Sequence, residues 1–177
     1  MISKNIKERI RDYFFKNPSS KLRVRQIERE LKLPLPSVIR YCRELEKENI
    51  LKEIEISGIV LYSADRTSKK FILEKRFFNI KTIFNSGLTE FLVSEYSNPV
   101  IVIFGSYSRG EDTEESDIDI YIETPSKKEV KLDKFEEILG REIQIFKYSS
   151  LPKIGNKHLR NSIINGFVLN NSLEAFK

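Results

Sequence analysis

A strand pattern that runs directly into a glycine turn most restricts how this 177-residue chain can fold. Residues 100–104 read Val-Ile-Val-Ile-Phe, and such a continuous β-branched and aromatic run predicts a buried strand. Gly105 and Ser106 follow it at once. After an acidic segment, residues 117–123 read Asp-Ile-Asp-Ile-Tyr-Ile-Glu, and this alternation predicts a second strand. We therefore expect a sheet with a tight turn after one strand and two acids on another.

The two acids, Asp117 and Asp119, are two residues apart and so project from one face of the predicted strand. Isoleucines occupy the opposite face, so the strand has no structural need of the acids, and neighbouring carboxylates repel each other. Carboxylate oxygens are hard ligands that suit Mg²⁺ or Mn²⁺. The pair therefore predicts a site for a divalent cation.

The net charge of +5 is unevenly distributed. Residues 99–150 contain 7 Lys and Arg against 12 Asp and Glu, whereas residues 1–65 contain 14 against 10. An acidic block suits a cation, and basic flanks suit a polyanionic partner. Solvated surfaces without a partner would produce the same distribution, so charge alone leaves both interpretations open.

One motif of the chain resembles the nucleotidyltransferase superfamily: Gly105-Ser106, then ten residues, then Asp117-Ile118-Asp119-Ile120. This superfamily includes DNA polymerase beta, kanamycin nucleotidyltransferase and the minimal nucleotidyltransferases of archaea and bacteria. The resemblance covers residues 99–177 and implies a mixed β-sheet. It also implies transfer of a nucleoside monophosphate from a nucleoside triphosphate, such as ATP, to a hydroxyl acceptor. The resemblance implies that phosphate is bound by Gly105, Ser106 and Arg109. It implies that Mg²⁺ or Mn²⁺ is bound by Asp117 and Asp119. For Arg109, an ion pair with the acidic segment is an open alternative.

The chain departs from the superfamily pattern at the third carboxylate, which relatives carry on a later strand. Residues 132–139 predict a helix and residues 140–148 the strand that follows, where the expected acid position holds Gln144. An amide can neither accept a proton nor bring negative charge to a metal. Glu142, two residues earlier on the same strand face, is an alternative third catalytic acid. The domain is therefore either an active transferase or a sensor of nucleotide or metal within a transcription regulator.

Residues 1–65 predict three helices followed by a β-hairpin. Apolar residues four apart over residues 2–15 predict the first helix, and residues 23–33 carry a second amphipathic stripe. The third helix is expected to begin at Ser37 as its N-cap. Residues 50–66 alternate around a Ser-Gly pair, as hairpins do. This order resembles winged helix-turn-helix transcriptional regulators.

The winged-helix resemblance implies that the third helix enters the DNA major groove and that the hairpin lies against the backbone. The residues implied to contact DNA share the outward face of that helix or the base of the hairpin: Ser37, Arg40, Arg43, Lys47 and Lys52. Arginine suits guanine edges and lysine suits phosphates. An ordinary solvated face is the open alternative, because three glutamates dilute the helix's charge.

The expected fold class is α+β: a winged-helix DNA-binding domain over residues 1–65, a helical connector over 66–98 and a nucleotidyltransferase-like domain over 99–177. We expect no membrane span, a cytoplasmic location, a buried Cys42 and His158 on the surface. The expected partners are DNA and a nucleoside triphosphate. Two further partners are open alternatives. One is a second copy of the chain, as a homodimer on paired DNA half-sites. The other is a small helical toxin, to which the chain would bind like the antitoxins among minimal nucleotidyltransferases.

Overall fold

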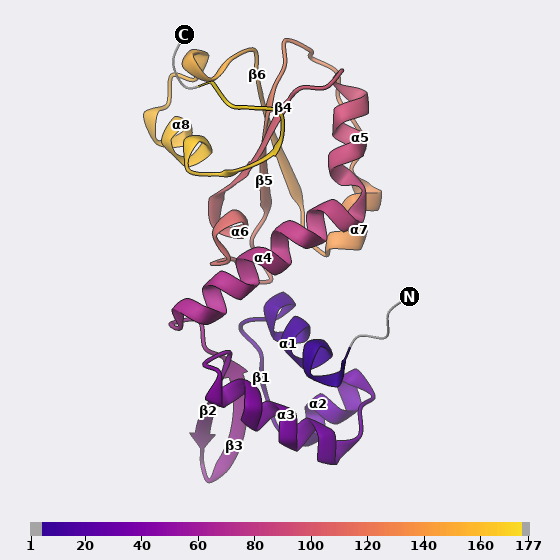
Figure 1. The fold of residues 1–177 in the computed structure, drawn as a ribbon, viewed down its shortest axis with the longest axis vertical. Helices are drawn as coiled ribbons and strands as arrows, with labels where there is room; N and C mark the ends of the chain where they lie inside the picture. The colour runs from indigo at the N-terminus through magenta and orange to yellow at the C-terminus, as the bar shows by residue number, and fades with distance from the viewer. Residues whose placement is uncertain (1–4, 175–177) are drawn as a thin grey trace. The chain divides into compact units, whose positions relative to one another are not determined.

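The computed structural model shown in Figure 1 describes residues 5–174. The chain divides into two compact units, residues 1–78 and 79–177, and the division falls inside helix α4 (Lys69–Ser86). In the described part of the chain, no helix is both long enough and apolar enough to cross a membrane.

The described part of the first unit contains helices and a small antiparallel sheet in the strand order β1-β3-β2. Its elements before α4 are α1 (Ile6–Lys16), β1 (Lys21–Leu22), α2 (Val24–Leu31), α3 (Leu35–Lys47), β2 (Leu51–Ile56) and β3 (Ile59–Ala64). The helices and the hairpin expected from the sequence are present, although Ile2 lies outside the described residues. Strand β1 was not expected, because two residues are too few to produce a recognisable alternation.

The expected start of the third helix was wrong. Helix α3 begins at Leu35 with Pro34 in the cap position, so Ser37 is an internal residue of the first turn rather than the N-cap. The Ser37 backbone N–H donates to the carbonyl of Pro34 at 3.0 Å. Pro36 does not prevent this earlier start, because an N–H in the first turn has no intrahelical acceptor to lose.

The core of the first unit confirms the helical stripes, with Ile10 and Phe14 of α1 packed against Ile27 of α2 and Val38 of α3. Cys42 of α3 lies in the same core and is 0% exposed. Burial raises the pKa of its thiol to about 12, because the thiolate loses its hydration in an apolar environment. Cys42 is therefore a small core side chain, as the sequence suggested.

The second unit is built on a four-stranded sheet in the order β6-β5-β4-β7. Only the pair β5 and β6 is parallel in this sheet, so the expected mixed α+β fold of this half is present. Its elements after α4 are α5 (Leu88–Glu95), β4 (Val100–Phe104), α6 (Gly105–Arg109), β5 (Ile118–Glu123), α7 (Asp133–Leu139), β6 (Ile143–Tyr148), a 3-10 turn η1 (Leu151–Lys153), α8 (Lys157–Ile164) and β7 (Phe167–Asn170).

Both faces of this sheet are covered, with α5 and α7 on one side and α8 on the other (Figure 1). Ile101 and Ile103 of β4 pack in one core, and Val102 and Phe104 pack in the other. A strand buried on both faces needs apolar residues at every position, which explains the continuous Val-Ile-Val-Ile-Phe run. The sheet is thus a rigid platform whose strand ends can hold polar groups.

Candidate active site

The turn that leaves β4 is packed against an acid of the neighbouring strand. Antiparallel pairing sets Phe104 of β4 opposite Asp119 of β5, and Gly105 comes next. Gly105 has a φ of +74°, and a Cβ atom there would lie 2.2 Å from Oδ2 of Asp119. Only glycine allows this backbone conformation and this close approach together. The start of α6 therefore lies directly beside the Asp119 carboxylate.

The acids lie at the start of β5, with Asp117 immediately before the strand and Asp119 as its second residue. The isoleucines between and after them are fully buried, which fixes the register of the strand. Burial raises the pKa of Asp119, the charge of Asp117 raises it further, and Arg109 acts in the opposite direction. The ionised pair is therefore destabilised in this environment, and a cation would relieve that repulsion.

The expected phosphate-binding residues all lie on α6. Gly105 is its first residue, Ser106 is half-buried in its first turn, and Arg109 is its last residue. Arg109 Nε donates to Oε2 of Glu111 at 2.7 Å, so the ion pair with the acidic segment is formed. Both side chains are about half exposed, and an exposed pair of this kind contributes only about 0–1 kcal/mol. The guanidinium can therefore exchange this carboxylate for another anion at little cost.

The parallel pairing of β5 and β6 decides which side chain on β6 lies near the acids. Gln144 is the partner of Asp119, and Ile143 is the partner of Ile118. The carbonyl of Glu142 accepts from the Ile118 N–H at 2.8 Å, which continues the ladder toward Asp117. Neighbouring strands are about 4.8 Å apart. The amide of Gln144 thus occupies the position beside Asp119, and Glu142 lies one step further along.

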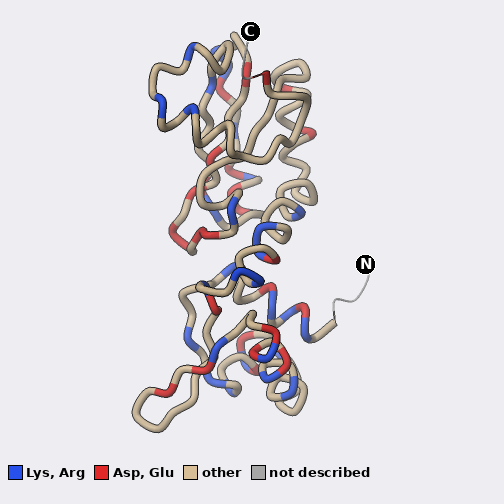
Figure 2. Tube along the Cα trace, turned by 60° about the vertical axis from the view of Figure 1, so that its left-hand side comes forward, with Lys and Arg blue, Asp and Glu red and all other residues tan. Residues whose placement is uncertain are grey.

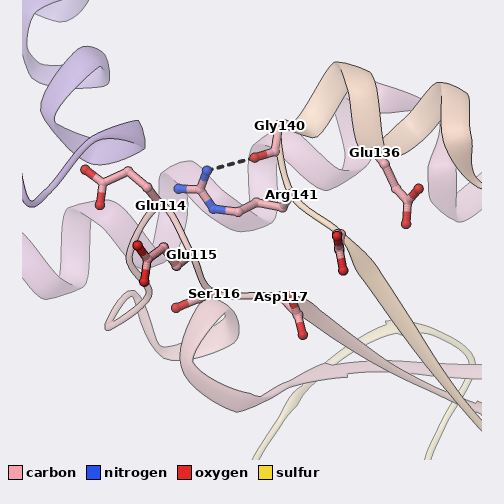
Figure 3. A pocket seen from close by; sticks show the side chains of 8 residues that line it. Glu114, Glu115, Ser116, Asp117, Glu136, Gly140 and Arg141 are labelled. Carbon is pink, nitrogen blue, oxygen red and sulfur yellow. Dashed lines mark hydrogen bonds between the residues drawn. The ribbon is translucent and has the colours of Figure 1, made fainter.

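A pocket of about 460 Å³ lies between the end of the acidic segment and the start of β6 (Figure 3). Its charged lining consists mainly of carboxylates: Glu114, Glu115, Asp117, Glu136, Glu142, with the single cation Arg141. Within residues 5–174, no three His, Cys, Asp or Glu side chains converge as a ready-made metal site. Glu142 shares the pocket with Asp117, but it does not complete a preformed three-carboxylate centre with the acid pair.

A buried polar network holds the acidic segment between α6 and β5 in place. The sequence did not reveal this network. The acidic segment itself is visible as a red run in Figure 2. The Asn79 side chain of α4 donates to the Tyr107 carbonyl at 2.8 Å and to Asp112 Oδ1 at 2.7 Å. Asp112, 2% exposed, also lies 3.9 Å from Nη2 of Arg141. In the sequence Asp112 looks like its acidic neighbours, so only its burial distinguishes it.

The expected DNA-binding residues lie in the first unit, where Arg40, Arg43 and Lys47 are exposed on α3. Arg40 Nε lies 3.8 Å from Oε1 of Glu44, and its guanidinium stacks over the ring of Tyr41. Lys52 is exposed on β2, whereas Ser37 is half-buried. Four of the five residues thus lie on α3, and three of these four are on its exposed face.

Comparison with known proteins concerns the second unit, because the family described as "Nucleotidyltransferase domain" matches residues 86–170. A curated protein of Methanocaldococcus jannaschii, named "Putative protein adenylyltransferase", is 39% identical over 79 residues, which cover 41% of this chain and 76% of the relative. The chain belongs to the nucleotidyltransferase family. A second protein of that organism with the same description is 37% identical to this nucleotidyltransferase over 67 residues, covering 35% of the chain and 72% of the relative. No solved structure matches the chain.

Membership of the family supports transfer of a nucleoside monophosphate as the general chemistry of this nucleotidyltransferase. Nucleotidyltransferases generally use a nucleoside triphosphate and a divalent metal ion. The matched range contains the Gly105 turn, both acids and Gln144.

Proposed function

We propose that the second unit transfers AMP from ATP to a hydroxyl group, with pyrophosphate as the leaving group. The contact between the Gly105 turn and Asp119 carries this proposal, because it joins a phosphate-binding backbone to the acid pair. The M. jannaschii relatives are named as protein adenylyltransferases, which favours ATP as the donor and a protein hydroxyl as the acceptor.

In this proposal, α6 binds the β- and γ-phosphates of ATP. The first N–H groups of a helix have no intrahelical acceptor, and the Gly105 turn lets a phosphate approach them closely. The Ser106 hydroxyl donates a further hydrogen bond. Arg109 leaves Glu111 and pairs with a phosphate oxygen, since its present ion pair is exposed and weak.

The acid pair fits a divalent cation. Asp117 and Asp119 offer hard oxygen donors from one strand face, and their mutual repulsion contributes to the raised pKa of Asp119. When bound there, Mg²⁺ or Mn²⁺ would neutralise charge that develops on the phosphates during in-line displacement. Asp117 and Asp119 would hold this ion next to the Gly105 turn.

Labelling with nucleotides tests this proposal directly. The pure protein, alone and with a protein extract as acceptor, is incubated with α-phosphate-labelled ATP, GTP, CTP or UTP in Mg²⁺ or Mn²⁺. We expect transfer of label from ATP with release of pyrophosphate, and loss of both when the metal is chelated. Absence of label and of pyrophosphate with every nucleotide would contradict the proposal.

A Gln144→Glu substitution should raise the rate of label transfer by about 10²-fold, because a carboxylate beside Asp119 can accept the proton of the attacking hydroxyl. Single-turnover rates at saturating ATP measure the change. A Glu142→Gln variant is the comparison. If Glu142 already supplies the third acid, its loss lowers the rate and Gln144→Glu brings no gain, which would refute this expectation.

A second candidate for this unit is nucleotide or metal sensing without transfer, and Gln144 opposite Asp119 favours it. Calorimetry separates the two candidates. ATP binding with no pyrophosphate release supports the sensor, whereas turnover excludes it.

We further propose that residues 1–65 form a winged-helix module that binds DNA, joined by residues 66–98 to the transferase domain of residues 99–177. The order α1-β1-α2-α3-β2-β3 and the strand order β1-β3-β2 support it. In this proposal α3 enters the major groove with Arg40, Arg43 and Lys47, and Lys52 contacts the backbone. Failure to retard any DNA duplex at low salt would overturn it, because phosphate contacts are strongest there.

A further inference from the structure

A basic groove of about 740 Å³ lies in the first unit between β1, the start of α2 and β3. Four cations line it, Lys21, Arg23, Arg25 and Arg29, and β3 contributes the apolar side chains of Val60 and Leu61. None of these residues belongs to the α3 face or the transferase site described above.

Local geometry brings the four cations together. Lys21 and Arg23 are two apart on extended backbone, so their side chains project to one side. Arg25 and Arg29 are four apart on α2 and therefore lie one above the other on one helix face. Pairing of Lys21 with Ser63 holds β1 against β3, the strand that contributes Val60 and Leu61 to the groove. All four cations are exposed.

The positive charge of the groove is uncompensated. No acidic side chain lines it, and across residues 5–174 none of its four cations forms an ion pair with a carboxylate. The cap residue and first turn of α2, residues 23–26, line the groove, so the positive end of the helix dipole lies at it. On α3, in contrast, Arg40 is close to Glu44 and Glu46 is exposed.

We propose that this groove is the main phosphate-binding surface for duplex DNA in the first unit, an inference that rests on the DNA binding proposed above. Duplex DNA carries one charge per about 1.7 Å of its axis, so several phosphates can lie along four adjacent cations. Gln26 Oε1 in the groove accepts the Arg23 N–H at 2.9 Å, and its Nε2 can still donate to a phosphate or to a purine N7. Val60, 48% exposed, supplies an apolar contact for a sugar or a thymine methyl group.

Salt-dependent binding of a DNA duplex to the full chain tests the groove. The groove variant changes Lys21, Arg23, Arg25 and Arg29 to Gln, which has about the same helix propensity as Arg at the two positions within α2. The binding constant K falls as salt rises, and each phosphate contact contributes about −0.9 to the slope of log K against log salt. Loss of the four contacts should therefore make the slope less negative by roughly 3 to 4. Affinity should fall on the order of 10³-fold at 0.1 M salt.

Two other variants show whether the change in salt dependence comes from the groove itself. The matched control changes four exposed lysines of the second unit, Lys127, Lys131, Lys134 and Lys157, to Gln and removes the same net charge. We expect its slope to stay near that of the wild type. A variant of Arg40, Arg43 and Lys47 should lose less of the slope than the groove variant. If the groove variant is unstable by circular dichroism, Arg25→Gln with Arg29→Gln should still lower the slope by about 2.

The outcomes separate this inference from the proposal on which it rests. If the wild type binds no duplex at low salt, DNA binding itself fails. If the wild type binds and the groove variant matches the lysine control, DNA binding stands and the groove is not its surface. Tighter binding of an RNA duplex of the same length would overturn the assignment to DNA.

Discussion

Changing Asp117 and Asp119 together to Asn should lower the rate of label transfer from ATP by about 10³-fold or more, since metal charge stabilisation contributes several kcal/mol. Asparagine keeps the size of each side chain but supplies no negative charge. Single-turnover labelling at saturating ATP and Mg²⁺ measures the loss. Unchanged labelling in this variant would refute the assignment of the acid pair.

Stability distinguishes a functional acid pair from a structural one. The pKa of Asp119 is raised by burial and then by Asp117, so the ionised carboxylate is less favourable in the folded state than in the unfolded chain. A neutral side chain relieves this, and the double variant should melt at or above the wild-type temperature at pH 7 in a metal chelator. The matched control, Glu90→Gln with Glu137→Gln, changes two exposed acids of the same unit and should keep full labelling.

A Gly105→Ala substitution should lower label transfer by about 10²-fold, because its Cβ would lie 2.2 Å from Oδ2 of Asp119 and would displace the carboxylate. The left-handed backbone adds a cost of about 1 kcal/mol to folding. Labelling kinetics and chemical denaturation measure the two effects separately.

Gly87→Ala is the matched control for this substitution. Gly87 has a φ of +76°, close to that of Gly105, but no atom lies within 4 Å of its added Cβ. Both variants should therefore lose similar stability, and only Gly105→Ala should lose labelling. Equal losses of activity in the two variants would show that the contact with Asp119 is unimportant.

Local patterns predicted the helices and the hairpin of the first unit, and β4, β5, α7 and β6 of the second, because each pattern depends on neighbouring residues. They did not predict β1, η1, α8 or β7. The hairpin turn falls at Ser57 and Gly58, where both residues have positive φ. Strand β4 reads as continuous apolar sequence because both its faces are covered. The expected N-cap of α3 was wrong by three residues, Ser37 instead of Pro34, since a proline in the first turn is compatible with an earlier start.

The sequence by itself determined the spacing of the acid pair, the glycine turn and the family, because these features lie within one continuous motif. Only the tertiary structure decided which β6 side chain lies beside Asp119, since register is set by pairing between strands that are distant in the chain. It also decided that Asp112 is buried on Asn79, and that four cations line one groove. Each of these arrangements depends on residues that only folding brings together.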